Sequence, residues 1–228
     1  MEVRKKFHDE LEELEADILR MGEIAERSVG RSVEALVAGD AALAAVVIEE
    51  DDVIDDLYLA VDRRILETLA LQTPVAGDLR LISAIIHINA HLERIGDMAV
   101  NVSKIFLSVR DLPNSPKILG QLQEMGDVVR PMIRTAMAAF ARRDLDLCLK
   151  LPSMDDPVDR LNMGMYKEVA ALASDAALLD WGMRMSMIAR QLERVGDNAV
   201  DIAEQVGFLL TGEFREFTDA SREVGSLE

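Results

Sequence analysis

Apolar residues recur every three or four positions along most of the chain, which is the spacing of one buried face on an amphipathic helix. Between residues 7 and 37 this series comprises Leu11, Leu14, Ile18, Met21, Ala25, Val29, Val33 and Leu36. The same periodicity predicts five further helices, over residues 40–71, 75–109 and 117–141, from residue 144 to about 172, and from about 175 to 211. The pattern therefore predicts an all-α fold.

Turn residues separate these helices. Gly39-Asp40 ends the first predicted helix and caps the second, and Gln72-Thr73-Pro74 ends the second. Residues 111–116 form the one stretch rich in turn residues between long helices, so we place the domain boundary there. The predicted division is a first unit over 1–112, a second over 113–212 and a polar tail over 213–228.

Two sequence motifs occur twice along the chain. Leu92-Glu93-Arg94-Ile95-Gly96-Asp97 recurs as Leu192-Glu193-Arg194-Val195-Gly196-Asp197, 100 residues later. In the preceding helix of each half, residues 52–57 align with residues 156–161, 104 residues on. The chain is therefore a duplicated three-helix unit.

Two prolines of the second half have no counterparts in the first. Pro152 and Pro157 predict that the fifth helix kinks or restarts there, with Asp155 or Asp156 as its N-cap.

Each repeated motif carries acidic or amide oxygens at i, i+4 and i+8, which share one helical face with steps of about 6 Å. These candidate metal ligands are Glu93, Asp97 and Asn101 in the first half and Glu193, Asp197 and Asp201 in the second. The preceding helices could add Asp52 with Asp55, and Asp156 with Asp159. An all-oxygen set suits Mg²⁺, Ca²⁺, Mn²⁺ or a carboxylate-bridged iron cluster, whereas zinc in a closed structural site favours Cys or His.

A solvated acidic helix face is the alternative interpretation of these residues, and for a single copy it would be the better one. The occurrence of the same residues at matched places in both halves favours a metal site. Like charges at i, i+4 also destabilise a helix, and a bound cation would offset that repulsion. Gly96 and Gly196 point the same way. A glycine inside a helix costs about 1 kcal/mol relative to alanine, so its repetition indicates a close helix approach or room for a site.

Composition narrows the function classes. The net charge of −17 argues against nucleic-acid binding, and no apolar stretch is long enough to span a bilayer or to form a secretion signal. A single cysteine, Cys148, allows no internal disulfide, fits a reducing cytoplasm, and is interpreted as a core residue.

His87 and His91 lie off the acidic face of their helix and are expected to be partnered or partly exposed. No catalytic constellation is present, so the sequence gives no support for an enzyme.

The stretch from Gln72-Thr73-Pro74-Val75-Ala76-Gly77-Asp78-Leu79-Arg80 to Asp97, together with residues 192–197, resembles the PhoU family of bacterial phosphate-signalling regulators. The resemblance covers nearly the whole chain as two tandem repeats. It implies two three-helix bundles related by an internal pseudo-twofold axis, multinuclear metal clusters of iron or zinc on the repeated acidic motifs, and a homodimer. Family members often carry His directly after Gly-Asp, where this chain has Met98 and Asn198.

The resemblance also implies a function. Such proteins are cytoplasmic adaptors, peripheral to the inner membrane, that link the ATPase subunit of the phosphate ABC transporter to a sensor histidine kinase. They act as negative regulators that keep the phosphate-starvation response off when phosphate is plentiful. The residues alone leave two alternatives open, namely a metal-dependent enzyme or metal-storage bundle that uses the same acidic residues, and an acidic scaffold without metal.

Overall fold

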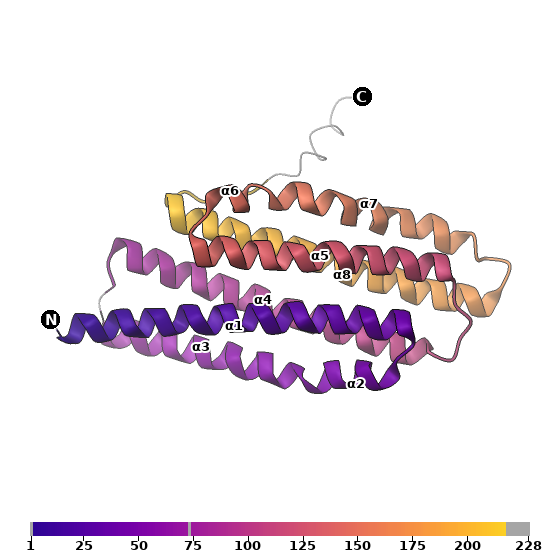
Figure 1. Ribbon diagram of the computed structural model, residues 1–228, viewed down its shortest axis with the longest axis horizontal. Coiled ribbons are helices and arrows are strands. Elements are labelled where there is room, and N and C mark those ends of the chain that lie inside the picture. The colour runs from indigo at the N-terminus through magenta and orange to yellow at the C-terminus, as the bar shows by residue number, and fades with distance from the viewer. Residues whose placement is uncertain (1, 73, 218–228) are drawn as a thin grey trace, which may run out of the picture.

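The computed structural model describes residues 2–72 and 74–217, with side chains from residue 6 onward, and within them every regular element is a helix (Figure 1). This confirms the all-α prediction. The helices are α1 (Glu2–Ala38), α2 (Ala41–Glu49), α3 (Asp51–Leu71), α4 (Ala76–Val109), α5 (Pro116–Arg142), α6 (Leu145–Cys148), α7 (Leu151–Ala170) and α8 (Ala176–Thr211).

The second and fifth predicted helices are each broken near their start. Glu50 separates α2 from α3, and residues 149–150 separate α6 from α7. The restart at Pro152 is as predicted, but the predicted N-cap is wrong, because α7 begins at Leu151 and Asp155 already lies inside it. The first half also breaks its second predicted helix, without a proline, at Glu50, which the 104-residue offset aligns with Met154. The two breaks therefore lie about one helical turn apart in the repeat.

Capping residues set the helix starts that the sequence predicts. Gly39 takes a left-handed conformation with φ +69°, and a carboxylate oxygen of Asp40 accepts hydrogen bonds from the N–H groups of Ala42 and Leu43, both at 3.0 Å. Asp144 caps α6, and Asp175 caps α8. The predicted boundary falls in the connection between Val109 and Pro116; of the predicted tail, residues 218–228 lie outside the described part.

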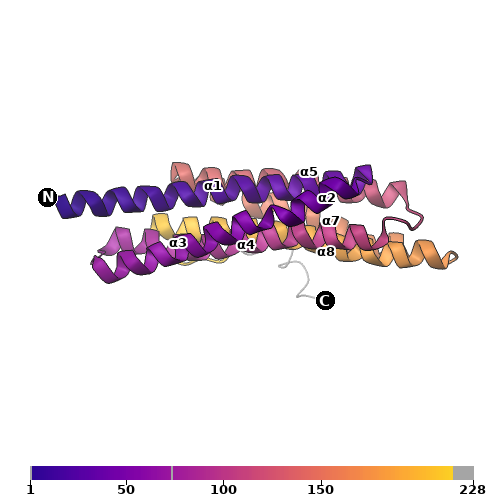
Figure 2. The same ribbon diagram turned by 90° about the horizontal axis from the view of Figure 1, so that it is seen from below.

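The six long helical segments form a flat bundle (Figures 1 and 2). Antiparallel α1 and α5 lie side by side in one layer, and antiparallel α4 and α8 lie side by side behind them. The α2–α3 segment flanks α1 and α4 on one side, and the α6–α7 segment flanks α5 and α8 on the other. Buried residues of both halves form a single continuous core, so the two repeats share their interior.

The contact between α1 and α5 shows the internal pseudo-twofold relation directly. A methyl group added at Gly22 would lie 2.8 Å from Cγ of Met137, and one added at Gly126 would lie 2.9 Å from Cγ1 of Val33. Gly22 and Val33 precede Gly126 and Met137 by 104 residues each. The two contacts are therefore reciprocal, as an isologous interface requires. None of the described helices is long and apolar enough to cross a membrane.

Replacing Gly126 by alanine tests this close approach. We expect Gly126→Ala to lower the free energy of unfolding by about 1–3 kcal/mol, because Val33 is buried and its branched side chain is stiff. Gly120 is the matched control on the same helix, since a methyl group there meets no atom within 4 Å. Gly120→Ala should stabilise the protein by about 0.5–1 kcal/mol. Urea unfolding measures both, and an unchanged Gly126→Ala variant would contradict the contact.

Candidate metal centre

Helices α3 and α4 bring four carboxylates together. Asp51 and Asp55 lie at i, i+4 on α3, and Glu93 and Asp97 lie at i, i+4 on α4. We call these four residues the first acid cluster. Between the two aspartates of α3, Ile54 is fully buried against Gly96, and this contact fixes which face of α3 points at α4.

The pKa values show that these carboxylates act on one another. Burial raises the pKa of Asp51 to about 6, with further increases from Asp55 and Asp97, while Lys104 acts in the opposite direction. Burial also raises the pKa values of Asp55 and Glu93, and Asp97 is the largest charge contribution to both. The first acid cluster therefore concentrates negative charge that a bound cation would offset.

Helices α7 and α8 repeat the arrangement with Asp155, Asp159, Glu193 and Asp197, the second acid cluster. Asp155 is 3% exposed and Glu193 is 7% exposed. Burial raises the pKa of Glu193 to about 7, Asp197 and Asp159 raise it further, and Arg190 and Arg194 lower it. Arg190 forms an ion pair with Oε1 of Glu193, while Oε2 is buried and has no hydrogen-bond partner within the described residues.

The repeated glycine makes room for an aspartate in both clusters. A methyl group added at Gly96 would lie 3.1 Å from Oδ1 of Asp51, and one added at Gly196 would overlap Oδ1 of Asp155. The sequence predicts either a close helix approach or room for a site, and the close approach is confirmed. A residue with a side chain at either position would displace a carboxylate of the cluster.

The predicted ligands fall into two groups. Glu93, Asp97, Asp55, Glu193, Asp197 and Asp159 lie in the acid clusters. Of the others, Asp52 is exposed beside Asp51, and Asp156 lies half-buried beside Asp155. Asn101 is exposed, and Asp201 lies 3.6 Å from Nδ1 of His91.

Sequence reasoning missed Asp51 and Asp155. The stretches 51–52 and 155–156 each hold two adjacent aspartates, and the sequence interpretation chose the second of each pair. Spacing was the available signal: Asp51 with Asp55, and Asp155 with Asp159, repeat the i, i+4 interval of Glu93 and Asp97.

His91 joins the two halves of the bundle. Its Nδ1 lies 2.9 Å from Oδ1 of Asn198 on α8, whose Nδ2 donates to the carbonyl oxygen of Arg194 at 2.7 Å. The prediction that His91 is partnered is confirmed, and Asn198, which stands where the resemblance suggested a histidine, is its partner. Cys148 is fully buried and burial raises its pKa to about 11, which confirms it as a core residue.

The donor chemistry of both acid clusters fits a hard cation. All eight side chains offer carboxylate oxygens. Burial and nearby carboxylates raise the pKa values of Asp51, Asp55, Glu93 and Glu193. Across residues 2–72 and 74–217, no three His, Cys, Asp or Glu side chains already stand in a metal-holding arrangement. Binding would therefore draw the carboxylates of α3 and α4, or of α7 and α8, toward one another.

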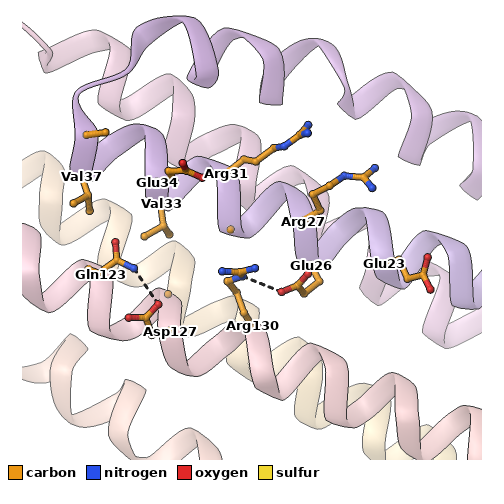
Figure 3. Close-up of a pocket in the computed structure, with 13 residues that line it drawn as sticks. Glu23, Glu26, Arg27, Arg31, Val33, Glu34, Val37, Gln123, Asp127 and Arg130 are labelled. Carbon is orange, nitrogen blue, oxygen red and sulfur yellow. Dashed lines mark hydrogen bonds and ion pairs between the residues drawn. The ribbon is translucent and has the colours of Figure 1, made fainter.

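A separate groove of about 550 Å³ lies between α1 and α5 (Figure 3). Arg130 points across it, and its Nε lies 2.9 Å from Oε1 of Glu26, which also accepts from Arg134. Arg31 pairs with Glu50 on the far side of α1. Three arginines and four acidic side chains line the groove, so its charges nearly cancel and it does not concentrate charge of one sign as the acid clusters do.

Comparison with known proteins identifies the duplicated unit. The profile of the PhoU domain matches residues 18–106 and 122–206. A phosphate-specific transport system accessory protein PhoU homolog from Clostridium acetobutylicum is 33% identical over 218 residues, which cover 95% of this chain and 99% of that protein. The crystal structure of PhoU from Pseudomonas aeruginosa superposes with a TM-score of 0.86 at 35% identity, covering 91% of this chain and all of that one. PhoU from Streptococcus pneumoniae gives a TM-score of 0.83 at 27% identity over 92% of this chain and 99% of that one.

Glu193 predicts a specific pH dependence for the metal-free protein. Its pKa is about 7 in the fold, against about 4.3 in an unfolded chain, so its stabilising contribution is complete below pH 4.3 and is lost as the pH rises to 7. Glu193→Gln keeps a neutral side chain at every pH. We therefore expect the free energy of unfolding of the variant, relative to that of the wild type, to rise by on the order of 2 kcal/mol from pH 5 to pH 8.

Thermal unfolding in chelator at both pH values measures this difference. Glu124→Gln, an exposed position on α5, is the matched control and should follow the wild type. Parallel pH curves for Glu193→Gln and the wild type would contradict the assignment.

Proposed function

The chain belongs to the PhoU family, and from this premise we propose that it is an adaptor between a phosphate ABC transporter and a sensor histidine kinase. The family consists of regulatory accessory proteins and not of enzymes, so the chain has a role in regulating phosphate transport. In the proposed role it is a negative regulator that keeps the phosphate-starvation response off while phosphate is plentiful.

One observation carries this proposal: the family match runs through both repeats and nearly the full length of each relative. The proposed partners are the ATPase subunit of the transporter and the kinase, which would hold the protein at the cytoplasmic face of the inner membrane. The net charge of −17 supports partners with basic patches, because complementary potentials steer association. A homodimer is part of the same proposal.

We further propose that each acid cluster holds metal, as a multinuclear or single site of iron, zinc, manganese, magnesium or calcium. Support comes from the duplication of all four carboxylates, from the raised pKa values of Asp51 and Glu193, and from the glycine that makes room in each cluster. A cation bound there supplies positive charge against the carboxylates. The four side chains of each cluster would then tie α3 to α4, or α7 to α8.

A metal-storage bundle would use the same residues. The relatives compared above are named for phosphate transport, which favours the regulatory role. A metal-dependent enzyme is not supported, because the family is one of accessory proteins.

Asp51 and the adjacent Asp52 provide a matched test of the metal site. We expect the combination Asp51→Asn and Asp55→Asn to abolish Mn²⁺ binding at the first acid cluster, because it removes both carboxylates of α3. Asp52→Asn should leave binding unchanged, because this exposed side chain lies outside the cluster. Calorimetric titration with Mn²⁺ and elemental analysis of the purified proteins measure the outcome. Equal metal content in all three proteins would exclude the first acid cluster as a site.

Deletion of the gene tests the regulatory role. We expect phosphate-starvation genes to become constitutively expressed on phosphate-rich medium, because the signal that holds the kinase off is lost. Transcript measurement in the deletion strain and in a strain complemented with the wild-type chain provides the readout and its control. Starvation genes that stay silent in the deletion strain would overturn the proposed function.

A further inference from the structure

A second groove, of about 500 Å³, lies between α7 and α8 and is lined largely by exposed apolar side chains. Tyr166 on α7 is 69% exposed, and Met183 and Met187 on α8 are 58% and 52% exposed. We call this surface the methionine groove. Met183 and Met187 lie at i, i+4 on one face of α8, so with Tyr166 they form two facing walls above the buried Val169.

The fold does not require apolar residues at these positions. The first repeat has the same backbone plan, and there Asp62, Ser83 and His87 occupy the places of Tyr166, Met183 and Met187. Each first-repeat side chain is polar and at least partly exposed to solvent. At a fourth lining position the first repeat has Ile86, 37% exposed, in the place of Ser186, so it presents one exposed apolar side chain where the second repeat presents three. The larger apolar surface of the second repeat needs an explanation other than packing.

The charge of the methionine groove differs from that of the chain as a whole. Among the described residues that line it, Arg190 is the single charged side chain, in a protein of net charge −17. The Arg190 side chain is 56% exposed, so its guanidinium group is accessible from the groove while it contacts Glu193. The first repeat has Ala90 at the corresponding place. An occupant that places a carboxylate at this end of the groove would complement the arginine.

We propose that the methionine groove is the docking site for an amphipathic helix of a partner protein, with an apolar stripe and an acidic residue beside it. Two packed antiparallel helices leave a furrow into which the side-chain ridge of a third helix fits. Flexible, polarisable methionine side chains adapt to the apolar stripe, and Arg190 sets the direction of the helix through its acidic residue. This inference deepens the proposed function, on which it rests for the existence of a protein partner.

The test is a binding titration with a labelled synthetic helix that carries leucines at i, i+3, i+4 and i+7 and one flanking glutamate. We expect the purified full chain to bind this peptide, and fluorescence anisotropy measures the affinity. The combination Tyr166→Asp, Met183→Ser and Met187→His installs the side chains of the first repeat and should weaken binding about tenfold or more. Arg190→Ala should weaken binding of the glutamate peptide about fivefold and leave a glutamine version of the peptide unaffected.

A matched control removes equally exposed apolar residues elsewhere. Leu59 and Leu66 on α3 are each 62% exposed, and Leu59→Gln with Leu66→Gln should bind the peptide as the wild type does. Circular dichroism and the melting temperature establish that every variant is folded.

Three results would overturn the proposal. The first is equal peptide affinity in the wild type and the triple variant. The second is a self-associated wild type that becomes monomeric in the triple variant by sedimentation equilibrium, which would make a second copy the occupant. The third is a wild type that co-sediments with anionic lipid vesicles but does not bind the peptide, together with a triple variant that no longer co-sediments with the vesicles. Because the titration involves no phosphate-regulated gene, its failure leaves the proposed function standing, and failure of the gene-expression test leaves the titration valid.

Discussion

The shared burial of α1, α4, α5 and α8 is the constraint on which the rest of the structure depends. Each of these helices carries an apolar face too wide for its own repeat to cover, and the two sets cover one another across the pseudo-twofold axis. Once α4 and α8 are held side by side in this way, α3 and α7 pack on their outer faces. The acid clusters form where those outer helices meet the central pair.

The acid clusters bury carboxylates between packed helices, which lowers the free energy of unfolding if they are ionised and unpaired. Asp155 and Glu193 are nearly inaccessible to water, and the carboxylates of Asp197 and Asp159 act on Glu193 alongside Arg190 and Arg194. Burial of ionised groups without compensation lowers stability, and the raised pKa values of Asp51 and Glu193 express this cost. Apolar residues in these places would make a more stable bundle. A cation bound as proposed above would offset this cost.

The two repeats share the same backbone arrangement but differ in the side chains at many equivalent positions. Lys104 acts on the first acid cluster from along α4, whereas Arg190 contacts Glu193 directly in the second. His91 of the first repeat bonds to Asn198 of the second, and the pseudo-symmetric position of that pair holds Gln191 and Met98 instead. Both copies carry the four carboxylates of an acid cluster and the glycine beside them, whereas other equivalent positions differ, both buried and exposed. Differences at exposed positions, which packing does not dictate, point to functions that belong to one repeat.

The sequence by itself determined the six long helical segments, their grouping in two repeats, the cap at Asp40, and the pairing of Glu93 with Asp97, because all of these follow from local spacing. Only the tertiary structure decided that Asp51, and not Asp52, faces α4. Adjacent residues on a helix point about 100° apart, and the rotation of α3 is set by Ile54 packing on Gly96. Likewise, the common core of both repeats and the contact between His91 and Asn198 join residues far apart in the chain. No local pattern encodes such contacts, because they arise from the packing of whole helices.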